Sequence, residues 1–246
     1  RAMGGVEDDD YYFDTALLKA ALEEMAVSSG CELLYYTTPV EVVKEGSLIA
    51  AVIVHNKNGF AAYQAKAFID CTGDADAAAM AGVPYQSGDH NKVNQPVSLR
   101  FEMAGIDFDR FHEYIRSLGN NSYKYFAMNT AGMKEIIEKA RDDGMLTPQD
   151  ACYFQAFGIP GRPDGMNFNC PELTTQENVV DAAFMTQKQV EGKKGILRLR
   201  NFLRARIPGF EKAYITEIAP LVGFRESRRI EAEYMLGIKD LLGYKK

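Results

Sequence analysis

The stretch AKAFIDCTGDADAAAMAGVP, residues 65–84, predicts a strand that leads through a tight turn into a helix. The aromatic Phe68 and the β-branched Ile69 favour a strand over residues 67–71, and Gly73 permits the positive φ of a sharp turn. Asp74 is a good N-cap for the alanine-rich helix that follows, and the closing Gly-Val-Pro predicts the end of that helix. The predicted unit is therefore strand, turn and helix.

A strand that runs directly into a helix N-terminus leaves backbone N–H groups free for an anionic ligand. Many α/β proteins hold a nucleotide in this way at the carboxyl ends of their strands. An ordinary strand-to-helix connection has the same spacing. The order Thr72-Gly73-Asp74 therefore leaves both a ligand site and a plain turn open.

The residues before this stretch predict a helix and a β-meander. Asp14 is placed to cap a helix with apolar residues on one face, and Gly30 is placed to end it. Residues 31–36 read as a short buried strand, and strands joined by Gly-containing turns are expected over residues 39–46, 47–56 and 59–67. We expect the strand at 67–71 to lie parallel to the strand at 31–36, in an incomplete α/β layer.

The later residues predict a separate unit of sheet and helices. Apolar and polar residues alternate over 97–104, which is the period of a half-buried strand. Helices are expected from Asp107 and over residues 134–141, and a hairpin over residues 152–170.

A long helix is expected after this hairpin. Thr174 and Glu177 form a capping box before it, and Gly192 or Gly195 is expected to interrupt it. The predicted fold class is mixed α/β (α+β), with a partial α/β layer and β-meander followed by a sheet-and-helix domain.

The composition argues against several classes of protein. The 246 residues carry a formal net charge of −6, which disfavours a general nucleic-acid binder. No apolar run has the length of a membrane span. The 4 cysteines form no C-x-x-C pair and are interpreted as small buried hydrophobic residues in a reducing compartment. A serine hydrolase or zinc protease lacks its motif.

Three segments resemble one protein family in the expected order. Thr72-Gly73-Asp74 with its helix, residues 95–107 (QPVSLRFEMAGID) and residues 222–236 (VGFRESRRIEAEYML) are similar to the FAD-dependent oxidoreductase family of two-domain, glutathione-reductase-like flavoproteins. The resemblance implies a partial FAD-binding domain, a substrate domain and a return segment, at residues 1–90, 91–220 and 221–246. No G-x-G-x-x-G occurs, so we expect a fragment without the family's phosphate-binding loop and closing flavin-contacting segment.

The same resemblance assigns residues to the cofactor FAD. It implies that Thr72, Gly73 and Asp74 contact the cofactor and that the backbone of Val40 contacts the adenine. Arg225 is the candidate catalytic residue, because a guanidinium can place positive charge near the flavin or an anionic substrate. A cluster of surface salt bridges around Arg225 is the alternative interpretation.

The implied function is transfer of a hydride between a small organic substrate, with an anionic one as an option, and flavin. A non-catalytic binding or assembly domain that keeps the scaffold without its cofactor is the alternative. We expect no nucleic-acid or membrane partner, and self-association through an incomplete sheet edge. The isolated chain is expected to be inactive and to retain no FAD. The expected compartment is the cytoplasm, and a signal sequence lost before Arg1 stays open.

Overall fold

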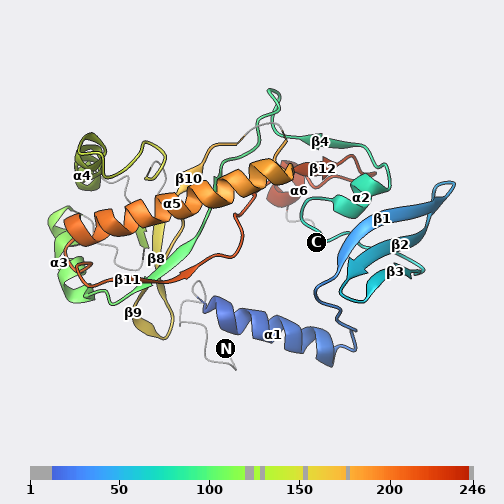
Figure 1. Cartoon of the computed structure of the whole chain (residues 1–246), viewed down its shortest axis with the longest axis horizontal. Coiled ribbons are helices and arrows are strands. Elements are labelled where there is room, and N and C mark those ends of the chain that lie inside the picture. The colour runs from blue at the N-terminus through green and yellow to red at the C-terminus, as the bar shows by residue number, and fades with distance from the viewer. Residues whose placement is uncertain (1–12, 120–124, 128–130, 152–154, 176–177, 244–246) are drawn as a thin grey trace. The chain divides into compact units, whose positions relative to one another are not determined.

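The computed structural model describes residues 13–119, 125–127, 131–151, 155–175 and 178–243 (Figure 1). The chain divides into two compact units. The sheet unit comprises Arg1–Glu32, Gln95–Thr175 and Val179–Arg225, and the meander unit comprises Leu33–Asn94, Gln176–Asn178 and Glu226–Lys246. Helices and mainly antiparallel strands occur together, so the predicted mixed α/β class is confirmed.

The sheet unit is built on a five-stranded sheet in the order β11-β6-β9-β8-β7, in which every neighbouring pair is antiparallel. Its strands are β6 (Phe101–Ala104), β7 (Tyr125–Ala127), β8 (Gln155–Ile159), β9 (Arg162–Phe168) and β11 (Tyr214–Ile218). A short second pair joins β5 (Val97–Ser98) to β10 (Glu172–Leu173). The predicted hairpin is confirmed as β8 and β9.

The alternation over residues 97–104 places one set of side chains in the core. Val97, Leu99, Phe101 and Met103 are almost fully buried, with α5 (Ala182–Arg206) contributing further buried residues to the same core. On the opposite face, Arg100 is exposed whereas Glu102 is only 6% exposed. A buried carboxylate requires hydrogen-bond or ion-pair partners, so this face of the sheet also carries polar side chains.

The start predicted for α5 is wrong. Its N-cap is Asp181, whose carboxylate accepts a hydrogen bond from the Phe184 N–H at 2.8 Å. Thr174 lies outside the helix and its hydroxyl accepts from the Lys188 ammonium at 3.5 Å, while Glu177 falls outside the described residues. An aspartate directly before the helix therefore caps it, and the capping-box spacing upstream has no such role.

The predicted interruption of α5 is also wrong, because the helix runs unbroken for 25 residues. Its glycines serve close packing. A Cβ on Gly192 would lie 3.0 Å from the Leu99 side chain, and one on Gly195 would lie 2.9 Å from Pro171. The missing side chains let the helix pack closely against Leu99, which follows β5, and against Pro171, which precedes β10.

Two other helices of the sheet unit, α1 (Thr15–Ser28) and α3 (Phe108–Ser117), begin where the sequence predicts. Asp14 caps α1 and Asp107 caps α3, in each case by accepting backbone N–H bonds. Helix α4 (Ala131–Asp142) includes the helix expected over residues 134–141. No described residue of α1 is buried, so its apolar face lies open in this structure.

The meander unit confirms the predicted three-stranded meander. Strands β1 (Thr38–Glu45), β2 (Leu48–Asn56) and β3 (Gly59–Tyr63) pair in the order β1-β2-β3 through two tight turns. The remaining elements are α2 (Asp76–Met80), β4 (Tyr85–Ser87), its antiparallel partner β12 (Arg228–Ile230) and α6 (Ile238–Leu242).

Two further strands that the sequence predicts are absent from the described residues. Residues 31–36 and 67–71 belong to no helix or strand, and Ile69 is 88% exposed. A strand exists through hydrogen bonds to a neighbouring strand, and among the described residues neither segment has one. The predicted parallel pairing is therefore wrong for this structure.

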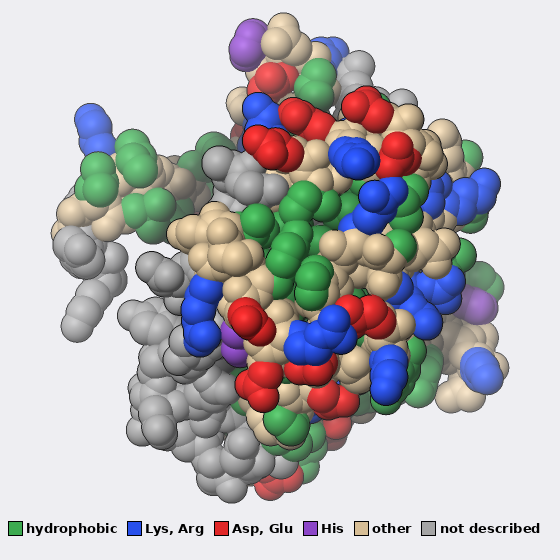
Figure 2. All heavy atoms as spheres, turned by 90° about the vertical axis from the view of Figure 1, so that its left-hand side faces the viewer, with side chains coloured by type: hydrophobic (Ala, Val, Ile, Leu, Met, Phe, Trp, Pro, Cys, Tyr) green, Lys and Arg blue, Asp and Glu red, His purple; other side chains and the backbone are tan. Residues whose placement is uncertain are grey.

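The surface mixes charges of both signs. Figure 2 shows the face on the left of Figure 1, where acidic and basic side chains are interspersed around apolar ones. Some charged side chains of the sheet unit form ion pairs: Arg206 contacts Asp143 at 2.6 Å, and Arg110 contacts Glu211 at 3.0 Å. Within the described part of the chain, no helix combines the length and hydropathy needed to cross a bilayer.

The cysteines only partly follow the prediction of buried hydrophobic residues. Cys170 is buried, as expected, whereas Cys31 and Cys71 are exposed, and each of the three is a free thiol. Cys152 lies outside the described residues. Cys31 and Cys71 lie in the two segments that the sequence predicts as buried strands. Because neither segment pairs with a neighbouring strand, the predicted strands and the predicted burial of these cysteines are wrong for the same reason.

Candidate functional site

The turn at residues 70–76 is held by side chains rather than by the cap that the sequence predicts. Helix α2 begins at Asp76, and its N-cap Ala75 has a positive φ of 54° and no side-chain bond. The Thr72 hydroxyl accepts the Asp76 N–H at 2.8 Å, and the Asp70 carboxylate accepts the N–H groups of Thr72 and Ala78, each at 2.9 Å. Asp70 and Thr72 therefore replace the predicted cap, Asp74.

This arrangement changes what the turn can bind. The first N–H groups of α2 already have acceptors, so the predicted free N–H groups for an anion are wrong. Burial raises the pKa of Asp70, but the hydrogen bonds from Thr72 and Ala78 outweigh this effect and leave the pKa below its ordinary value. A carboxylate ionised at neutral pH disfavours a phosphate at this helix end.

Gly73 has the positive φ that its position predicts, at 85°. Apart from its two chain neighbours, no described residue has an atom within 4 Å of the position that a Cβ would take, so the backbone here faces open space. Thr72 and Gly73 are exposed, and Asp74 is half-buried. The turn thus presents backbone and a carboxylate at an accessible surface.

The segment at residues 226–229 folds onto this turn. The Ser227 hydroxyl donates to the Asp74 carboxylate at 2.5 Å, although the two residues are 153 positions apart. Arg228 donates to the Asp74 carbonyl at 3.1 Å and to the Asp76 carboxylate at 2.7 Å. Ser227 is 2% exposed, so this contact is one of the buried polar links of the meander unit.

Arg225 takes no part in these contacts. It is exposed, and no ion pair or hydrogen bond of its side chain occurs among the described residues. Its neighbour Arg229 donates to the Gly88 carbonyl at 2.6 Å and to Glu226 at 3.2 Å. The alternative of a salt-bridge cluster therefore describes Arg228 and Arg229, and leaves Arg225 outside it.

Val40 lies at an irregularity of β1. The pairing passes from Pro39 opposite Val54 to Glu41 opposite Ile53, so Val40 has no partner residue in β2. A bulged residue is left out of the ladder of hydrogen bonds. The predicted contact of the Val40 backbone with a ligand therefore falls at an irregularity of the strand.

An apolar cavity of about 690 Å³ lies in the meander unit between β1, β2, the 68–72 segment and α2. Its walls include Pro39, Val52, Phe68 and Ala78, with Thr72 at its polar edge. The cavity has the size and lining of a site for a planar organic group. These residues fit a ring and a hydroxyl-bearing portion of FAD, whereas the carboxylate at the start of α2 does not fit its pyrophosphate.

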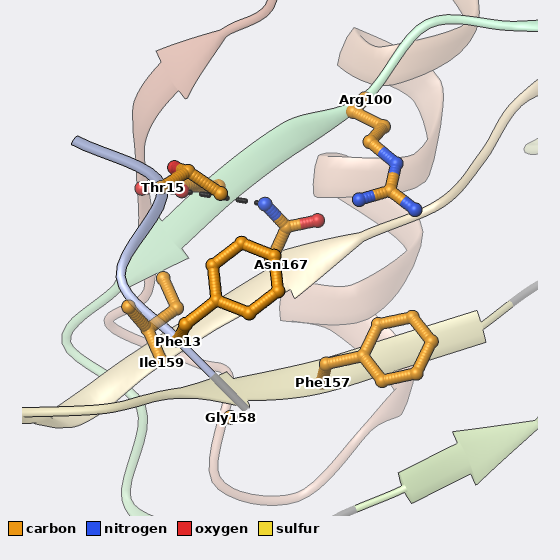
Figure 3. Close-up of a pocket in the computed structure, with 8 residues that line it drawn as sticks. Phe13, Thr15, Arg100, Phe157, Gly158, Ile159 and Asn167 are labelled. Atoms are coloured by element: carbon orange, nitrogen blue, oxygen red, sulfur yellow. Dashed lines mark hydrogen bonds between the residues drawn. The ribbon is translucent and has the colours of Figure 1, made fainter. Parts of the chain in front are cut away.

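A second cavity, of about 480 Å³, lies in the sheet unit on the face of the sheet opposite its core (Figure 3). Phe13, Phe157 and Ile159 form apolar walls, and Arg100 and Asn167 supply polar groups. No motif in the sequence points to these residues as a site. The alternation over residues 97–104 contained the only signal, because it places Arg100 and Glu102 together on the face away from the core.

No group of three or more histidine, cysteine or carboxylate side chains placed to bind a metal occurs among the residues that the structure describes.

Solved structures that resemble the chain are larger proteins. A geranylgeranyl bacteriochlorophyll reductase-like protein from Thermoplasma acidophilum has 14% identity and a TM-score of 0.47, over 84% of this chain and 41% of that one. The flavin-dependent brominase Bmp2 has 13% identity and a TM-score of 0.43, over 86% and 46%. A triple mutant of that brominase has 14% identity and a TM-score of 0.46, over 86% and 47%. The chain thus spans less than half of the length of each of these structures.

A search of curated proteins found no match. The sequence profile of the family described as FAD dependent oxidoreductase matches residues 2–246, and thus nearly every residue, including the turn at Thr72–Asp74 and the segment at 226–229. The protein therefore belongs to the FAD-dependent oxidoreductase family.

Proposed function

We propose that the protein takes part in an FAD-dependent oxidation or reduction in which a hydride passes between a small organic substrate and flavin. The observation that carries this proposal is the cluster in which Ser227 and Arg228 bind Asp74 and Asp76. Two segments that resemble parts of the family, one of them its cofactor motif at Thr72-Gly73-Asp74, meet there although they are far apart in the sequence. Their meeting supports a common role at one site.

The residues of the meander unit would divide the cofactor between them. Gly73 and Asp74 would hold a hydroxyl-bearing portion, because the backbone is accessible at Gly73 and a carboxylate accepts hydrogen bonds from hydroxyl groups. The apolar cavity would take a planar ring, with the backbone of Val40 beside it in β1. When bound, FAD supplies the group that accepts or donates a hydride, and the protein binds and orients it.

Arg225 is proposed to serve an anionic group of the substrate or cofactor. It is exposed and its guanidinium has no ion-pair partner among the described residues, so its charge is available to a ligand. Arg228 and Arg229 are occupied by protein acceptors and are better explained as positioning residues for the turn and the loop at Gly88.

A non-catalytic binding or assembly domain is the second candidate. The occupied N–H groups and the carboxylates at the start of α2 favour it, because they disfavour a phosphate at the position where the family resemblance places a dinucleotide. In that case the contacts of Asp74 with Ser227 and Arg228 would be purely structural.

The test is the visible absorbance spectrum of the full-length protein, purified and desalted after incubation with FAD. We expect a flavin band at about one FAD per protein, which disappears on anaerobic reduction and returns with an oxidising substrate. Asp74→Asn should lower the retained flavin, and Asp109→Asn on α3 is the matched control. A folded protein that retains no flavin under any of these conditions would favour the second candidate.

A further inference from the structure

The polar groups in the cavity of the sheet unit form a network of hydrogen bonds and ion pairs. Glu102 is buried, and its carboxylate accepts from Arg162 at 2.8 Å and from the Asn167 amide nitrogen at 3.3 Å. Arg162 also contacts Asp14 at 3.5 Å, and the other Asp14 oxygen caps α1. Both carboxylates therefore have partners within the protein.

The orientation of the Asn167 amide follows from these contacts. A carboxylate can only accept hydrogen bonds, so the amide must turn its nitrogen toward Glu102. Its oxygen then faces the other way, where it is buried and has no hydrogen-bond partner among the described residues. In Figure 3 the oxygen lies on the side of Arg100. An unsatisfied buried acceptor is costly, and a ligand with a donor group would remove that cost.

Arg100 is the remaining charged group of this cavity. It follows β5 on the polar face of the sheet, and its guanidinium has no ion pair or hydrogen bond among the described residues. Arg162 serves both Glu102 and Asp14, so Arg100 is the guanidinium of this cavity that has no protein partner among the described residues, and it lies beside one free acceptor. Phe13, Phe157 and Ile159 supply apolar walls around them.

We propose that this cavity binds a small hydroxy acid with an apolar body, and that this compound class is the substrate of the oxidoreductase. Arg100 pairs with the carboxylate, Asn167 Oδ1 accepts the hydrogen bond of the hydroxyl group, and the phenylalanines pack on the apolar body. The identity of this compound class as substrate rests on the proposed function, whereas its binding to the cavity does not. A volume of about 480 Å³ accommodates a compound of the size of a substituted benzene.

The experiment is an NMR titration of the ¹⁵N-labelled chain, without flavin, with mandelate, phenylacetate or benzyl alcohol. All three compounds have a phenyl ring. Mandelate carries both a carboxylate and a hydroxyl group, phenylacetate only the carboxylate, and benzyl alcohol only the hydroxyl group. We expect mandelate to shift the amide signals of Gly158 and Ile159 with a millimolar Kd, phenylacetate to bind about fivefold more weakly and benzyl alcohol at least tenfold more weakly.

Two variants separate the contributions of the polar groups. Arg100→Met should raise the Kd of both acids about tenfold or more, whereas Arg204→Met, which removes an exposed arginine of α5 outside the cavity, should leave both unchanged. Asn167→Leu should abolish the preference for mandelate over phenylacetate. The comparison of the two acids on the unchanged protein tests the same contact if this variant does not fold.

Several outcomes would overturn the proposal. The proposal is wrong if benzyl alcohol binds as tightly as mandelate, or if Arg100→Met leaves the Kd of mandelate unchanged. It is also wrong if mandelate shifts neither the Gly158 nor the Ile159 signal at the highest concentration that stays in solution. Because the titration contains no flavin, its result is independent of the absorbance test of the proposed function. If the protein binds hydroxy acids but retains no FAD, the proposed function is rejected and the binding site is kept. If it retains FAD but does not bind hydroxy acids, the binding site is rejected and the proposed function is kept.

Discussion

At the scale of single residues, Gly73 and Asp70 do different work in the same turn. Gly73 adopts a φ of 85°, which residues with a side chain rarely adopt, yet the space that a Cβ would occupy is open. Asp70 binds two backbone N–H groups and the Thr72 hydroxyl, and so holds the turn from within. One residue allows the conformation and the other stabilises it.

The open space at Gly73 allows strain and ligand contact to be separated. Gly73→Asn should fold normally, because asparagine tolerates a positive φ, but its side chain should lower flavin retention by the full-length protein. Gly73→Val should lose about 1–2 kcal/mol of stability as well, because a β-branched residue is strained there. Flavin absorbance and thermal unfolding measure the two effects. Equal flavin content in Gly73→Asn and the unchanged protein would exclude contact at this residue.

The lowered pKa of Asp70 predicts a pH dependence of the turn. A carboxylate whose pKa is lower in the folded state stabilises that state above the unfolded pKa of about 3.9, and loses this effect as pH falls through the lower folded value. We expect hydrogen-exchange protection of the Asp76 and Ala78 amides to decrease in that acid range. Asp70→Asn should cost about 1 kcal/mol at neutral pH and flatten the dependence. Protection that is the same in both proteins at pH 7 would contradict this.

At the scale of elements, α5 owes its position to glycines that would weaken an isolated helix. Glycine costs about 1 kcal/mol relative to alanine in a helix interior. At Gly195 an added Cβ would lie 2.9 Å from both Pro171 and the Asp150 carboxylate. Arg198 holds that carboxylate with hydrogen bonds of 2.6 and 2.8 Å, so it is not free to move aside.

Gly195→Ala should therefore destabilise the sheet unit despite the better helix propensity of alanine. Overpacking costs about 1–3 kcal/mol and outweighs the gain of about 1 kcal/mol. Urea unfolding measures the difference, and Lys194→Ala on the exposed side of the same helix is the control, with an expected change within about 0.5 kcal/mol. A more stable Gly195→Ala protein would show that the helix can move away from Pro171.

At the scale of the whole molecule, the ion pair of Arg198 and Asp150 joins α5 to the segment that follows α4. Asp150 is 2% exposed and also accepts the Thr147 N–H at 2.7 Å, so its charge is fully compensated within the fold. Such pairs add little net stability, but removal of one partner leaves a buried charge uncompensated.

Arg198→Met should consequently lower the free energy of unfolding by about 3 kcal/mol at neutral pH. Arg200→Met removes an arginine that bonds only the adjacent Asn201 among the described residues, and should change stability by less than about 0.5 kcal/mol. Chemical denaturation followed by circular dichroism compares the two variants. Equal losses in both would assign the effect to general charge rather than to the buried pair.

The sequence by itself determined the features that depend on neighbouring residues. The caps Asp14 and Asp107, the turns of the β1–β3 meander and the alternation over residues 97–104 follow from local conformation and periodicity, and the structure confirms each of them. The family was also within reach of the sequence, because short motifs in a fixed order carry it.

Only the tertiary structure decided the features that need a distant partner. Residues 31–36 and 67–71 have strand-like composition but no strand beside them, and α5 keeps its glycines because Leu99 and Pro171 lie against them. The contact of Ser227 with Asp74, and the cavity that joins Arg100 to Asn167, likewise bring together residues far apart in the chain. Local propensity acts over one turn or one strand, whereas pairing, packing and charge compensation are settled only when the whole chain is folded.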